Sequence, residues 1–155
     1  MKNKIFAAMS MLSFGFLSGC AGELPANLGV INGRLNSCPS SPNCVSSQAA
    51  PDDKRHFIDP IAYTGEKQEA FHTLLEIIQS MERTKITMSA DSYLRAEFSS
   101  SLMGFVDDVE FYFPEQPLIH IRSASRKGYG DLGVNRKRVE RIRALFEGVF
   151  AGDNQ

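Results

Sequence analysis

The chain has 155 residues, with 17 Lys and Arg against 18 Asp and Glu, giving a formal net charge of −1. This length suits a single folded domain, and the charge balance lacks the basic excess that is typical of nucleic-acid-binding proteins. We therefore expect one domain and no nucleic acid partner.

The N-terminal residues have the pattern of a bacterial lipoprotein signal. Lys2 and Lys4 give a basic start, an apolar stretch runs to Phe16, and Leu-Ser-Gly-Cys at 17–20 closes it. The apolar stretch is too short to cross a bilayer. We interpret residues 1–19 as a removable signal peptide.

The last residue of this pattern, Cys20, is then the lipid attachment site, carrying palmitate-like acyl chains. Several acyl chains on one residue anchor a protein stably, so the membrane is an expected partner. Ala21 follows Cys20, where an Asp would resemble an inner-membrane retention signal. We therefore expect a lipoprotein of the bacterial cell envelope, in the outer membrane and facing the periplasm.

The other two cysteines, Cys38 and Cys44, are six residues apart in a Pro- and Asn-containing segment. Such a segment bends readily, and export to an oxidising compartment favours a disulfide. The alternative is a zinc site, which needs about four ligands, and no His or second Cys pair lies nearby in the sequence. We predict a disulfide, and neither a metal nor another cofactor.

The predicted secondary structure begins after residue 60. Residues 20–36 are rich in Gly, Asn and Pro and are predicted to be a lipidated tether. Apolar residues recur at helical spacing over about 66–82, and runs of period two follow at 85–90, 93–99, 105–113 and 119–125. A second apolar helical stripe starts at Asn135 and ends at Gly152.

This order, helix, four strands, helix, predicts an α+β fold over residues 37–151. We expect a two-layer sandwich, in which a four-stranded antiparallel meander carries two helices on one face. The other face of the sheet is predicted to be solvated and charged. It is interpreted either as a ladder of ion pairs or as a polar binding surface. Its members are Tyr93, Arg95, Glu97, Asp108, Glu110, Tyr112, His120, Arg122 and Arg126.

The segment 122–138 is unusual in its chemistry. The core-facing register of the last strand continues into two serines, a glycine-rich loop follows, and cations open the last helix. Free amides, glycines and cations at a helix N-terminus attract anions. The predicted anion-binding residues are Ser123, Ser125, Arg126, Gly128, Asp131, Gly133, Asn135, Arg136 and Arg138. Alternatively, Asp107 and Asp131 pair with Arg126 and Arg136, and the loop is purely structural.

Searches for catalytic patterns find nothing that supports an enzyme. The chain has no Gly-x-Ser-x-Gly elbow and no P-loop. His56, His72 and His120 lack metal-ligand spacing. Asp107 and Asp108 point to opposite faces of a strand, so they cannot act as a carboxylate pair on one bond. We assign no catalytic residue.

Two blocks are similar to a known family. The first is Cys-Pro-Ser-Ser-Pro-Asn-Cys-Val-Ser-Ser at 38–47, and the second runs from Arg-Ser-Ala-Ser-Arg at 122–126 to Arg138. Together they resemble the bacterial and plastid family called domain of unknown function 1499, over about residues 36–150. The resemblance implies no activity. It makes these blocks the family's signatures, and we expect the disulfide loop and the glycine loop to lie side by side and to form one site.

These observations predict a non-enzymatic envelope lipoprotein. Its expected ligand is a small anionic, amphipathic or lipid-like molecule. The alternative is a module that binds an envelope protein through the charged face of the sheet.

Overall fold

The structure is a computed structural model that describes residues 22–101 and 104–152. The predicted signal peptide and Cys20 lie outside the described residues. Within them, no helix is long and apolar enough to cross a membrane. The elements are β1 (Val30–Ile31), β2 (Arg34–Leu35), β3 (Cys44–Ser46), β4 (Ile61–Ala62), α1 (Lys67–Ser80), β5 (Thr84–Ala90), β6 (Tyr93–Ser99), β7 (Val106–Tyr112), β8 (Leu118–Ser125) and α2 (Val134–Gly152).

The main sheet has six antiparallel strands in the order β3-β8-β7-β6-β5, with β4 also paired to β8, and β1 and β2 form a separate two-stranded sheet. The prediction of a four-stranded meander, with all strands between the two helices, is therefore wrong. The four alternating runs are strands β5 to β8, but β3 and β4 precede α1. With three and two residues, these two are too short to show a period.

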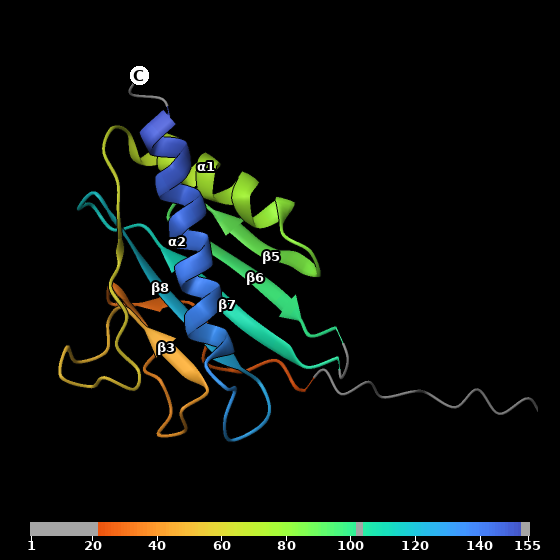
Figure 1. Ribbon diagram of the computed structural model, residues 1–155. Helices are drawn as coiled ribbons and strands as arrows, with labels where there is room; N and C mark the ends of the chain where they lie inside the picture. Colours follow the sequence, from red (N-terminus) through yellow and green to blue (C-terminus); the bar gives the residue numbers. More distant parts are fainter. Residues whose placement is uncertain (1–21, 102–103, 153–155) are drawn as a thin grey trace, which may run out of the picture.

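The hydrophobic core lies between the sheet and the two helices (Figure 1). Leu74 and Ile78 of α1 and Ile142 of α2 are fully buried against Phe111 and Ile121 of the sheet. Burying side chains of this size stabilises a fold by about 1.5–3 kcal/mol each. Both apolar stripes read from the sequence therefore cover one face of the sheet.

One hydroxyl group closes the gap between β3 and β4 along β8. Ser47 Oγ accepts a hydrogen bond of 2.8 Å from the backbone N–H of Ile121. The Ser47 N–H in turn donates to the Ile121 carbonyl at 2.9 Å. Because buried backbone groups need partners, Ser47 substitutes for a strand at this point.

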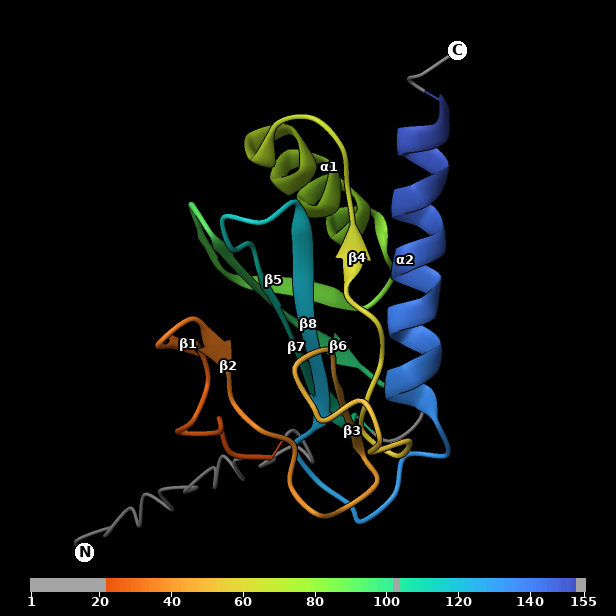
Figure 2. The same cartoon turned by 90° about the vertical axis from the view of Figure 1, so that its left-hand side faces the viewer.

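The second face of the sheet is covered rather than solvated, which corrects our expectation. Residues 22–37, with β1 and β2, pack across it on the side opposite the helices (Figure 2). Gly29 N–H donates to Glu110 Oε1 at 2.7 Å, and Glu110 and Arg122 are only 0% and 5% exposed. Alternating polar residues identify the face of a sheet that lies away from the apolar core. They do not show whether that face is covered by another segment or by water. This covering segment lies mostly within residues 20–36, which were predicted to be a lipidated tether. The attachment of lipid to Cys20 stays a prediction.

The predicted disulfide between Cys38 and Cys44 is present, with Cα atoms 5.6 Å apart. Cys44 is fully buried in β3 and pairs with Ala124 of β8. The bridge therefore fastens the preceding loop to the edge of the sheet.

We predict that replacing both Cys38 and Cys44 by Ser lowers the free energy of unfolding by about 2–3 kcal/mol, because the unfolded chain regains the entropy of a short closed loop. Urea unfolding of the variant and of the wild type, with and without reductant, measures this. Equal midpoints in the oxidised wild type and the variant would contradict it.

Candidate functional site

The two signature blocks lie side by side. The Asn43 amide, in the disulfide loop, donates to the Gly128 carbonyl at 2.6 Å, and the Asn43 carbonyl accepts from Ser125 N–H at 3.0 Å. Strand β3 continues this contact along β8. The expectation that the cysteine loop and the glycine loop are neighbours is confirmed.

Asn135, at the start of α2, is the centre of this contact. Its side chain is completely buried. Its Nδ2 donates to the Asn43 carbonyl, Ser125 Oγ and the Asp131 carboxylate at 2.8–3.0 Å. Its Oδ1 accepts from Ser123 Oγ at 2.6 Å. The two serines in core-facing register thus have partners, and the polar end of β8 is buried under a helix N-terminus.

Asp131 caps the N-terminus of α2 from within the glycine loop. Its carboxylate accepts from the backbone N–H groups of Gly133 and Asn135 at 2.9 and 2.8 Å. Burial raises the pKa of Asp131, but these hydrogen bonds outweigh burial, so its pKa is lowered overall. Leu132 and Gly133 take positive φ values of 53° and 77° to make the turn. Amides that a bound anion would need are therefore already taken by Asp131.

Two of the predicted anion-binding arginines are paired with carboxylates. Arg126 binds Asp108 and Glu97, and the hydrogen bond with Asp108, outweighing burial, raises the pKa of the guanidinium group. Arg138 binds Asp107 and stacks over the Phe98 ring at 4.9 Å. The neighbouring aspartates Asp107 and Asp108 thus point to opposite faces, and each has its own arginine.

Arg136 makes its side-chain hydrogen bonds with the carbonyls of Lys54 and Arg55, at 3.4 and 3.1 Å. It borders a shallow groove between the disulfide loop and the glycine loop, which Arg55 and Leu132 also line. The alternative pairing of Asp107 and Asp131 with Arg126 and Arg136 is therefore not the one that forms.

A third ionic group lies under the covering segment. The Glu110 carboxylate accepts hydrogen bonds from Arg122 Nη1 at 3.0 Å and Tyr93 Oη at 2.8 Å. Burial raises the pKa of Tyr93, and the negative charge of the nearby Glu110 raises it further. Arg122 Nε is the one buried side-chain nitrogen or oxygen without a partner among the described residues.

A larger cleft lies between the C-terminal end of α1, the β6–β7 connection and the first turns of α2. Its volume is about 770 Å³. Met81, Phe98 and Leu145 give it apolar walls, and Lys137 and Arg141 border it. The residues predicted to bind an anion do not include Lys137, Arg141 or Leu145. Their spacing could have indicated a shared surface, because residues 137, 141 and 145 lie on one side of a helix.

Both of these cations are available for a ligand. Lys137 and Arg141 are exposed, and their side chains make no hydrogen bond or ion pair within residues 22–101 and 104–152. Arg83, at the same cleft, pairs with the exposed Glu82, an interaction worth little in water. Basic groups beside apolar walls suit an amphipathic anion.

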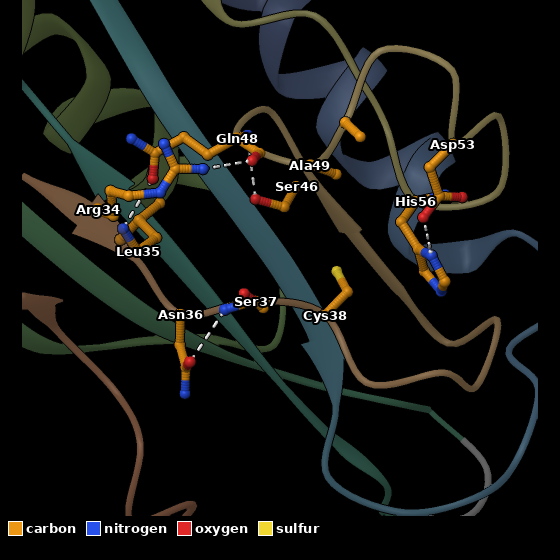
Figure 3. A pocket seen from close by; sticks show the side chains of 11 residues that line it. Arg34, Leu35, Asn36, Ser37, Cys38, Ser46, Gln48, Ala49, Asp53 and His56 are labelled. Carbon is orange, nitrogen blue, oxygen red and sulfur yellow. Dashed lines mark hydrogen bonds and ion pairs between the residues drawn. The ribbon is translucent and has the colours of Figure 1, made fainter.

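A smaller polar cavity of about 220 Å³ lies between the covering segment and the disulfide loop (Figure 3). His56 Nδ1 is 2.7 Å from Asp53 Oδ2, and its Nε2 is 3.2 Å from the Ser41 carbonyl. Both partners offer oxygen atoms to the ring. The hydrogen bond from His56 lowers the pKa of Asp53, despite some desolvation. This ring holds the disulfide loop in place.

One serine–histidine contact meets the distance criterion for a nucleophile and base. Ser47 Oγ lies 3.1 Å from His120 Nδ1. Burial, and then the positive charge of Arg34, lower the pKa of His120, which favours the neutral ring. However, Ser47 is 7% exposed and already accepts the Ile121 N–H, and neither residue lines a cavity described above. The contact is structural, because a nucleophile needs access to substrate.

Within the described residues, no group of three or more His, Cys, Asp or Glu side chains is placed to hold a metal ion.

Comparison with known families matches residues 34–146 to the family described as Protein of unknown function (DUF1499). The chain belongs to this family. The match spans both signature blocks and most of the described domain. No curated protein and no solved structure matches the chain.

We predict that Asn135→Ala lowers the free energy of unfolding by about 2–3 kcal/mol, because it leaves buried groups of Asn43, Ser123 and Ser125 short of partners. Thermal and urea unfolding measure the change. The control is Asn36→Ala, which removes two exposed hydrogen bonds, one to the Asn27 carbonyl and one from the Ser37 N–H, and is expected to cost about 0.5 kcal/mol or less. Equal effects of the two substitutions would contradict a central role for Asn135.

We predict that Asp131 stabilises the fold only where its carboxylate is ionised. Its folded pKa is lowered, so the stabilisation is complete above the unfolded pKa of about 3.9 and is lost as the pH falls through the folded value. The difference in unfolding free energy between wild type and Asp131→Ala, measured from pH 7 to pH 2, should therefore shrink on acidification. A difference independent of pH would contradict the cap.

Proposed function

We propose that this protein is a non-enzymatic, lipid-anchored protein of the bacterial cell envelope that binds a small amphipathic anion. The cleft bordered by Lys137 and Arg141 is the proposed site. The single observation that carries the proposal is the juxtaposition, in one cleft, of exposed cations without acidic partners and apolar walls.

The size and chemistry of the cleft support this ligand class. A volume of about 770 Å³ lies in the range of small-molecule sites, which combine apolar walls with a few placed polar groups. An anionic head would lie between Lys137 and Arg141, and an apolar tail would contact Met81 and Leu145. Arg138 also lines the cleft, but its charge is neutralised by Asp107.

Anchoring and localisation are proposed on the sequence of residues 1–21. The basic start, the short apolar stretch and Leu-Ser-Gly-Cys support lipid attachment at Cys20. The disulfide between Cys38 and Cys44 is compatible with an oxidising compartment such as the periplasm. Ala21 favours the outer membrane over the inner one.

The alternative, an envelope protein partner bound through the charged face of the sheet, has less support. Residues 22–37 cover that face, and Glu110 and Arg122 are buried beneath them. A partner would first have to displace this segment.

We predict that decanoate binds the protein and that Lys137→Ala/Arg141→Ala weakens its binding about tenfold or more, since each lost charge contributes about 1 kcal/mol. Calorimetric titration of the protein measures the affinity, and native mass spectrometry identifies any ligand that is retained from the cell.

The matched control is Lys67→Ala, which removes a cation from an exposed pair with Glu115 outside the cleft and should leave the affinity unchanged. Decanol, which keeps the tail without the charge, should bind more weakly than decanoate. Absence of decanoate binding to the folded wild type, or equal loss in Lys67→Ala, would overturn the proposed site.

A further inference from the structure

The glycine loop carries the two most exposed large hydrophobic side chains of the described residues. Leu132 is 96% exposed and Tyr129 75%, and the adjoining Val134 of α2 is 46% exposed. Neither the fold nor the proposed ligand cleft uses Tyr129 or Leu132. Exposed aromatic and aliphatic side chains on one loop tip indicate a surface that contacts something apolar.

Cations without acidic partners surround this loop tip. Lys127 and Lys137 are exposed and make no side-chain hydrogen bond or ion pair among the described residues. Arg136 and Arg55 donate only to backbone carbonyls. The acidic residue of the loop, Asp131, is turned inward onto the amides of α2. Apolar side chains with a cationic rim fit the interface of an anionic bilayer.

The start of the described chain lies at the same end of the molecule. A Cβ atom built on Gly22 would lie 3.0 Å from Arg126 Cβ and 3.3 Å from Lys127 Cγ. Figures 1 and 2 agree that the chain enters the domain near the 126–133 loop, whereas α2 ends at the opposite end. Only Ala21 separates Cys20 from Gly22, and two steps along the chain span at most about 7 Å.

We propose that the loop of residues 127–134 docks onto the membrane that holds the lipid on Cys20, with Tyr129 and Leu132 in the bilayer interface and Lys127, Arg136 and Arg55 against anionic headgroups. This inference rests on the lipid anchor of the proposed function. Docking sets the orientation of the domain and holds the cleft, which shares Val134 and Lys137 with this end, next to the lipid surface. The occupant is the bilayer, because the chain leaves the domain at this loop.

The chain contains no Trp, so a single introduced Trp reports its own depth. Full-length protein is processed in cells, its lipidation is verified by intact mass, and it is reconstituted in vesicles of phosphatidylethanolamine and phosphatidylglycerol with brominated acyl chains. Fluorescence of Tyr129→Trp should be strongly quenched. The matched control is Val149→Trp, at a position that is 43% exposed and about 22 Å further along α2, and should not be quenched.

Three further variants, each in the Tyr129→Trp background, sharpen the test. Leu132→Asn keeps a residue that tolerates positive φ, so the loop should fold while quenching falls. Lys127→Ala should lower the ratio of docked to undocked protein about fivefold on these vesicles. Arg141→Ala, a ligand-cleft variant, should leave quenching unchanged, which separates the two proposals.

The lipid on Cys20 and the quenching at the two positions together test the docking proposal. Lipid on Cys20 together with quenching in Tyr129→Trp but not in Val149→Trp supports docking, whether or not decanoate binds the cleft. Lipid on Cys20 without quenching in Tyr129→Trp, or with equal quenching at both positions, overturns it. Cross-linking of the unquenched loop to an envelope protein would assign the apolar tip to a protein partner and would equally overturn bilayer docking.

Discussion

The hydrogen bonds of Asn135 are the constraint on which the arrangement of the domain depends. Its amide is fully buried and joins the disulfide loop, the end of β8, the glycine loop and the start of α2. A buried amide that loses a partner destabilises the fold by about 1–3 kcal/mol, so these segments cannot move independently. For this reason a strand that is apolar at Ile119 and Ile121 can end in Ser123 and Ser125 without a gap in the core.

Ion pairs with β7 decide which charges remain for function. Arg126 and Arg138 lie beside β7, where Asp108 and Asp107 neutralise them on opposite faces of the strand. Breaking a buried or half-buried pair of this kind leaves an uncompensated charge, which is strongly unfavourable. Lys127, Lys137 and Arg141, on α2 and the loop before it, are exposed and form no ion pair among the described residues, so they can meet a ligand or a lipid surface.

Burial of Glu110 and Arg122 gives the N-terminal segment a structural role. Gly29 donates to the Glu110 carboxylate, so residues 22–37 contribute to a site that would otherwise be open to water. In the proposed envelope setting, the segment that leads to the lipid is also packed on the sheet. Only Ala21 would then separate the lipidated Cys20 from this packed segment, and so short a link would restrict how the domain can be oriented above the bilayer.

The extent of sequence-based prediction follows from which interactions are local. The helical stripes of α1 and α2, the period of β5 to β8 and the bend between Cys38 and Cys44 all arise within single segments, so the sequence by itself determined them. Strands β3 and β4 exist only because β8 offers its edge, and two or three residues carry no period of their own. The partners of Arg126 and Arg138, the cover over Glu110 and the cleft at Lys137 and Arg141 were decided by the tertiary structure, because each joins residues distant in the sequence. The sequence indicates that buried charged side chains need partners, but only the packing of the folded chain decides which partners they have.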